Sequence, residues 1–144
     1  MKTLNPTVVT QNISLELANK MIEAALAKAE QLGIPFSISI VDSVGYLKAF
    51  SAMDGAPVLS LDIAQNKAFS AATYKRATHE WYDRIKDDPP LLHGIVHTPG
   101  LVIFGGGFPI RLNDQVIGGV GVSGGHYSQD MQVAEAALEV LKSI

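Results

Sequence analysis

The sequence predicts an α+β domain built on an antiparallel sheet. Two long segments in the first half repeat apolar residues with helical spacing, and several shorter segments alternate as strands do. A last helical segment closes the chain. Because hairpin-length links join consecutive strands, the pattern favours an antiparallel sheet over a doubly wound parallel one. With 144 residues, of which 47% are hydrophobic, we expect one domain over residues 1–144.

Four segments are predicted to be helical. Residues 14–32 carry apolar residues three and four apart, with Ser14 as N-cap and Gly33 as the stop. Residues 59–72 are rich in small residues that allow close packing, and a short helix is expected over 78–85. The last helix is predicted to begin at Ser128, as its N-cap.

Five strands are predicted. Residues 36–41 and 46–51 form a hairpin whose turn Asp42 caps, and residues 101–104, 108–112 and 116–123 follow as three consecutive strands. Between these groups, residues 87–90 read Asp-Asp-Pro-Pro and are expected to end helical structure.

Composition excludes several classes of function. The chain has a net charge of -3 and no cluster of Lys and Arg, so we expect no nucleic-acid partner. No apolar stretch approaches eighteen residues, which predicts a cytoplasmic protein without a membrane partner. Only 17% of the residues are charged and the mean hydropathy is +0.20, so apolar surface is expected to form contacts in a homo-oligomer.

The chain contains no cysteine, which excludes disulfides, thiolate nucleophiles and iron–sulfur clusters. A metal would be held by His, Asp, Glu, Met or Tyr. Phosphate-binding loops ending in Lys-Ser or Lys-Thr are absent as well, and no Ser-His-Asp or paired-carboxylate arrangement supports a hydrolase.

A glycine-rich run at residues 118–125 leads directly into the last helix. It contains Gly119-x-Gly121-x-x-Gly124, the spacing of a dinucleotide fingerprint, but too little chain follows for the second strand of that unit. Glycines in a strand leave room for a ligand or a neighbouring backbone. We therefore expect either a ligand pocket there or a tight, closely packed turn.

The candidate site residues surround this run. His93, His97 and His126 are candidate ligands of haem iron or another metal, whereas His79 is assigned to a helix surface and a structural role. Lys67 and Arg111 interrupt apolar faces and are candidate partners of a carboxylate. The alternative is a Lys whose stem packs on apolar surface and an Arg that faces solvent. The remaining candidates, at the end of the run and the start of the helix, are Gly124, Gly125, Ser128 and Asp130.

Several motifs together resemble the GlcG/HbpS-like family, called the haem-degrading domain, and the C-terminal domain of PduO-type proteins. The motifs are residues 41–56, Lys67-Ala68, Pro99-Gly100, residues 106–110, residues 118–125, Asp130 and Ala134. The resemblance implies a profilin-like fold with about five antiparallel strands between helical layers, and an oligomer. In haem-binding relatives a histidine of the first helix can ligate the iron, but residues 14–32 contain none.

Three functions follow from these observations. The first is a cytoplasmic protein that binds haem or a small carboxylate metabolite, accessory to glycolate, glycerol or diol catabolism as the resemblance implies. The second is an enzyme acting on a small hydroxy acid or diol-derived metabolite, with His126 or His97 as general base and Arg111 holding a carboxylate. The third is a structural assembly partner of a catabolic enzyme complex.

Overall fold

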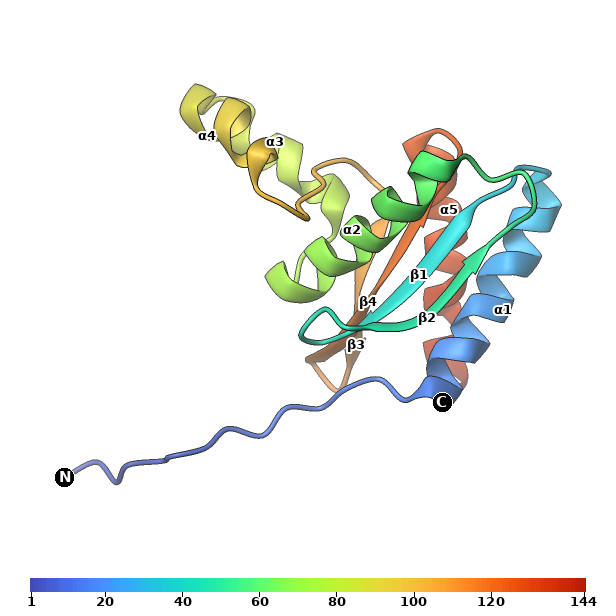
Figure 1. The fold of residues 1–144 in the computed structure, drawn as a ribbon. Coiled ribbons are helices and arrows are strands. Elements are labelled where there is room, and N and C mark those ends of the chain that lie inside the picture. Colours follow the sequence, from blue (N-terminus) through green and yellow to red (C-terminus); the bar gives the residue numbers. More distant parts are fainter.

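The computed structural model describes residues 1–144 as an antiparallel sheet of four strands between two helical layers (Figure 1). The strand order is β2-β1-β4-β3, with α2 on one face and α1 and α5 on the other. The strands are β1 (Ser37–Asp42), β2 (Leu47–Ala52), β3 (Gly107–Leu112) and β4 (Gln115–Ser123). The helices are α1 (Leu15–Leu32), α2 (Val58–Tyr74), α3 (Trp81–Ile85), α4 (Pro89–Gly94) and α5 (Tyr127–Glu139). Short 3-10 turns occupy Thr78–Glu80, Ile95–His97 and Val140–Ser143.

Helix α1 begins and ends where its sequence predicts. The Ser14 side chain accepts a hydrogen bond from the backbone N–H of Leu17 at 3.1 Å. Gly33 ends the helix in the left-handed conformation, with φ of 70°. The apolar face of α1 packs with α5 against the sheet, and the main core of 16 buried residues lies between them.

Helix α2 packs directly on the glycine-rich strand β4. A Cβ atom at Gly119 would overlap the carbonyl oxygen of Ala68, and one at Gly121 would overlap that of Ala64. Because Ala64 and Ala68 are themselves small and fully buried, the helix backbone lies close to the strand backbone. Helix α2 therefore fills the space that these two glycines create, which is close packing, the alternative to a ligand pocket.

The prediction of five strands was also wrong, because residues 101–104 do not join the sheet. Their polar backbone groups bond elsewhere: the N–H of Val102 donates to the Ser70 side chain of α2 at 3.0 Å. The N–H of Leu101 donates to the carbonyl of Thr98 at 3.2 Å. This segment crosses the end of α2 as irregular chain, and β3 remains an edge strand.

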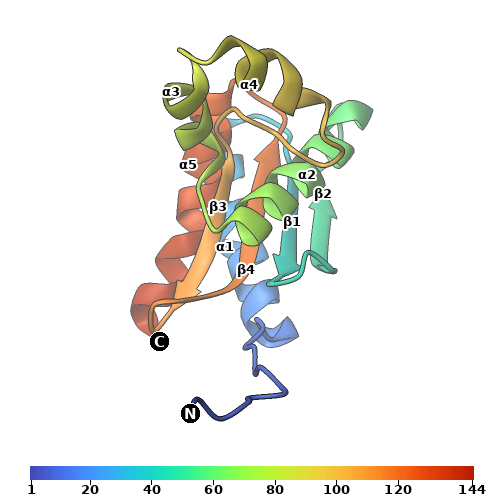
Figure 2. The ribbon, with the colours of Figure 1, turned by 90° about the vertical axis from the view of Figure 1, so that its left-hand side faces the viewer.

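Helix α3 ends at Ile85, before residues 87–90 as predicted, but a second helix that was not predicted begins at Pro89. Pro89 opens α4, and the Asp88 side chain accepts from the N–H of Leu91 at 3.4 Å. Proline at the first position lacks an N–H that the helix would leave unpaired in any case. Helices α3 and α4 together project from one end of the sheet, and both chain termini lie at the other end (Figure 2).

Two further features concern the surface. No helix has both the length and the apolar character needed to cross a membrane. The first twelve residues are exposed and extend away from the body of the molecule (Figure 1).

Candidate functional site

An apolar pocket lies at the end of the sheet from which α3 and α4 project (Figure 2). It has a volume of about 490 Å³, within the range of small-molecule sites. Three separate parts of the chain line it: the 78–85 region, the irregular segment 101–106, and the first residue of α5. The lining residues are His79, Tyr82, Asp83, Ile103, Phe104, Gly105 and Tyr127.

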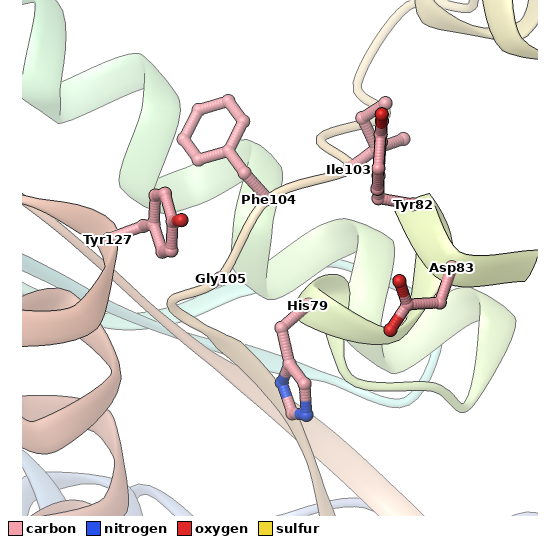
Figure 3. Close-up of a pocket in the computed structure, with 7 residues that line it drawn as sticks. All are labelled: His79, Tyr82, Asp83, Ile103, Phe104, Gly105 and Tyr127. Atoms are coloured by element: carbon pink, nitrogen blue, oxygen red, sulfur yellow. The ribbon is translucent and has the colours of Figure 1, made fainter. Parts of the chain in front are cut away.

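Aromatic and apolar side chains form two facing walls (Figure 3). Phe104 and Tyr127 lie near each other, and Tyr82 and Ile103 lie together further to the right in this view. The imidazole of His79 lies below these side chains in the view and packs against the ring of Phe108, 5.6 Å away between ring centroids. The pocket thus combines apolar surface with one imidazole and two phenol groups.

A buried ion pair lies directly behind the Phe104 wall. The Nζ atom of Lys67 donates to Oδ2 of Asp130 at 2.8 Å and to the carbonyl of Val122 at 2.9 Å. The Lys67 side chain is completely buried, and its ammonium lies 4.9 Å from the centroid of the Phe104 ring. A Cβ at Gly106 would come within 2.6 Å of the same Nζ atom. The pocket and the ion pair are therefore separated by the Phe104 ring and one layer of backbone.

Burial shifts the pKa values of both partners toward their neutral forms. Desolvation lowers the pKa of Lys67 below 10.5, and the hydrogen bond and charge of Asp130 oppose that shift only in part. Desolvation likewise raises the pKa of Asp130 above 3.8, against the hydrogen bonds from Lys67 and from the N–H of Gly125. Neither Lys67 nor Asp130 contacts the pocket, so this pair holds α2, β4 and α5 together.

The predicted cluster at the start of α5 is a helix cap. The Nδ1 atom of His126 accepts from the N–H of Ser128 at 3.2 Å, so His126 and not Ser128 is the N-cap. The N–H of Gly125 donates to Oδ1 of Asp130 at 3.0 Å, and Gly124 lies against the backbone of Phe36. These donors already have partners within the chain, and Gly124, Gly125, Ser128 and Asp130 lie outside the lining of the pocket described above.

The other predicted residues lie apart from the pocket and from one another. His93 lies in the last turn of α4 and His97 ends the following 3-10 turn; both are exposed and outside the pocket lining. Arg111 is exposed and donates to the carbonyl of Lys75 at 2.7 Å. It pairs with Val116, while His126 follows Ser123 at the far end of β4, about 23 Å of strand away. The proposed pairing of His126 with Arg111 in one enzyme site is therefore not formed.

The pocket residues were missed because no sequence pattern joins them. His79 had been assigned a structural role, yet it is the histidine that lines the pocket. One usable signal was the Gly105-Gly106-Gly107 run, where a Cβ at each position would meet Met131, Lys67 or Thr78. Such a run marks a segment pressed against its neighbours, which is how residues 103–105 come to form a pocket wall.

Comparison with known proteins identifies the family. A sequence model of the haem-degrading HbpS-like proteins matches residues 13–139. The chain is 40% identical to an uncharacterised 15.0 kDa protein from the dhaT-dhaS intergenic region of Citrobacter freundii, over 98% of this chain and all of that protein. It is 35% identical to the corrinoid adenosyltransferase PduO of Salmonella typhimurium over 90% of this chain, but spans only 39% of PduO.

Solved structures agree with this assignment. The crystal structure of the Klebsiella pneumoniae protein ORFY has a TM-score of 0.91 and 36% identity, with 99% of each chain covered. The crystal structure of a PduOC:heme complex has a TM-score of 0.81 and 34% identity, covering 89% of this chain and 94% of that one. The resemblance to the GlcG/HbpS-like family is confirmed, and the chain belongs to the haem-degrading HbpS-like proteins.

Proposed function

We propose that this protein binds haem in the pocket between α3, residues 103–105 and the start of α5. The observation that carries the proposal is the pocket's lining, which brings His79, Tyr82 and Tyr127 together with Phe104 and Ile103. Histidine and tyrosine both ligate haem iron in proteins, and apolar side chains suit the faces of a porphyrin. The residues present therefore fit haem, and a relative of 34% identity has been crystallised as a heme complex.

The charged groups near the pocket indicate which interactions would hold haem there. The only formal charge among the lining residues is the carboxylate of Asp83, whose Oδ1 lies 3.7 Å from Nζ of the half-exposed Lys86. Lys67 is buried behind Phe104 and paired with Asp130. Ring contacts and iron ligation, rather than a buried cation, would therefore supply most of the affinity.

A visible absorption titration with haemin tests the proposal. We expect a shifted Soret band with the wild-type protein, and a weaker or spectrally altered complex with His79→Ala or with the double variant Tyr82→Phe/Tyr127→Phe. The matched control is His93→Ala/His97→Ala, which removes two exposed imidazoles outside the pocket. An unshifted wild-type spectrum would refute haem binding. Loss of the shift only in the His93/His97 control or in His126→Ala would instead support the ligands predicted from the sequence.

The proposal includes a cytoplasmic location, a homo-oligomeric state and an accessory role in glycolate, glycerol or diol catabolism. A small carboxylate metabolite, the other ligand predicted, is less well supported because the lining holds no free cation.

A further inference from the structure

The first eleven residues form an arm that makes no hydrogen bond to the body of its own chain, and Asn12, whose Oδ1 accepts from the N–H of Ser43 at 3.0 Å, holds the base of the arm. No backbone hydrogen bond is made before Ile13, whose N–H donates to the carbonyl of Ile117 at 2.9 Å. Within the arm, residues 7–10 read Thr-Val-Val-Thr, a run of β-branched residues typical of a strand. Val8 is 87% exposed and Val9 is 92% exposed. The arm therefore combines strand-forming sequence with unpaired backbone and uncovered apolar side chains.

The same chain carries an open sheet edge. The outer edge of β2 pairs with nothing, since its only neighbour is β1. The opposite edge, β3, is protected by Pro109, which has no N–H to offer a further strand. Exposed apolar side chains surround the beginning of β2, among them Val44, Tyr46 and Leu47. An unpaired edge next to apolar surface is the usual site of strand addition.

We infer that the arm of one copy of this chain adds as a strand to the β2 edge of a second copy, and that the exchange is reciprocal. Each molecule supplies one arm and one edge, so a two-fold axis satisfies both at once. The paired strands would form hydrogen bonds that neither element makes alone, and Val8 and Val9 would be covered by the partner. This interface lies away from the pocket and does not depend on haem binding.

Charge indicates the direction of the added strand. Lys2 is the only charged side chain among residues 1–12. With Thr10 opposite Lys48 in an antiparallel arrangement, the arm extends past the end of β2 and brings Lys2 near the partner's Asp54. Asp54 is exposed and has no ion pair. A parallel arrangement would instead direct Lys2 toward the opposite end of β2, away from Asp54, where the nearest carboxylate of the turn, Asp42, already accepts from the N–H groups of Val44 and Tyr46 at 3.0 Å.

Sedimentation of the full chain and of a chain lacking residues 2–10 tests the exchange. Asn12 and Ile13, which anchor the arm, are kept. A subtler pair is Val8→Pro/Val9→Pro, which removes both N–H groups of the central arm, and the control Thr3→Pro, which lies beyond the paired region. We expect the deletion and the double variant to weaken self-association roughly tenfold or more, and the control to leave it unchanged. A monomeric full chain, or equal association of all four proteins, would overturn the inference.

Cross-linking tests the direction and is clean because the chain has no cysteine. An equimolar mixture of Thr10→Cys and Lys48→Cys chains should form a disulfide-linked dimer under mild oxidation, in excess over either chain alone. A mixture of Thr3→Cys and Lys48→Cys serves as the control. Equal cross-linking in the two mixtures would contradict the antiparallel pairing.

Discussion

Substitution of Gly121 by alanine separates two explanations of the glycine-rich strand. If the glycines exist to admit a ligand, Gly121→Ala should weaken binding and leave the fold intact. If they exist to admit helix α2, the same change should destabilise the protein. The structure supports the second explanation, because a Cβ at Gly121 would overlap the carbonyl oxygen of Ala64 and the N atom of Ala68.

The expected magnitude follows from what must move. Overpacking a core with extra carbon atoms costs about 1–3 kcal/mol when side chains can adjust. Here the obstacle is the backbone of α2, so the helix would have to shift away from β4, and we expect a loss of about 3 kcal/mol. For a domain of this size, that loss lowers Tm by roughly 6–12 °C.

Urea unfolding of wild type, Gly121→Ala and Gly94→Ala measures the effect. Gly94 ends α4, and a Cβ there meets no atom within 4 Å, so its substitution should be neutral or stabilising by up to about 1 kcal/mol. A Gly121→Ala protein within about 0.5 kcal/mol of wild type would refute the packing explanation.

Three further predictions concern stability. Lys67→Met should lower the free energy of unfolding by about 3–5 kcal/mol, because it leaves the Asp130 carboxylate buried without its ion-pair partner. The double variant Lys67→Met/Asp130→Leu should recover part of this loss in the same urea assay. Because burial raises the pKa of Asp130, the folded chain keeps this proton to higher pH than the unfolded chain does. The contribution of Asp130 to stability should therefore be fully present below pH 3.8 and decline as the pH rises through its folded-state pKa. Wild type should gain stability relative to Asp130→Asn as the pH falls. A difference in unfolding free energy between the two proteins that does not change with pH would contradict this. Ser14→Ala should cost about 1 kcal/mol by removing the N-cap of α1, with Ser143→Ala, near the chain end, as the control.

Local signals in the sequence predicted most of the fold. The cap at Ser14, the stop at Gly33 and the turn at Asp42 act within a few residues of themselves, and the structure has each of them in place. Pro89 was predicted to end helical structure, but proline is also favoured in the first turn of a helix. Here the Asp88 side chain caps a new helix that begins at Pro89. Residues 101–104 have strand-like composition, but their backbone bonds to Ser70, which is distant in sequence, decide their conformation.

The candidate site was much less predictable. The sequence singled out Lys67 and Asp130 as candidate ligand-binding residues, but it could not show that they bond to each other, since they are 63 residues apart. The pocket is assembled from three segments whose contact depends on how α3 and residues 101–106 cross the end of the sheet. Periodicity carries no information about such crossings, and His79 therefore looked like an ordinary surface residue.

The two sides of the pocket are anchored differently, one through a buried ion pair and the other through the apolar side chains of Trp81 and Ile85. Tyr127 begins a helix whose first turn is fastened to the interior through Asp130, whereas Tyr82 and Asp83 belong to α3, a helix of five residues on a projecting subregion. We therefore expect a ligand larger than the present opening to displace α3 and α4, while α5 stays in place. Amide exchange should accordingly be faster along residues 81–94 than along residues 127–139.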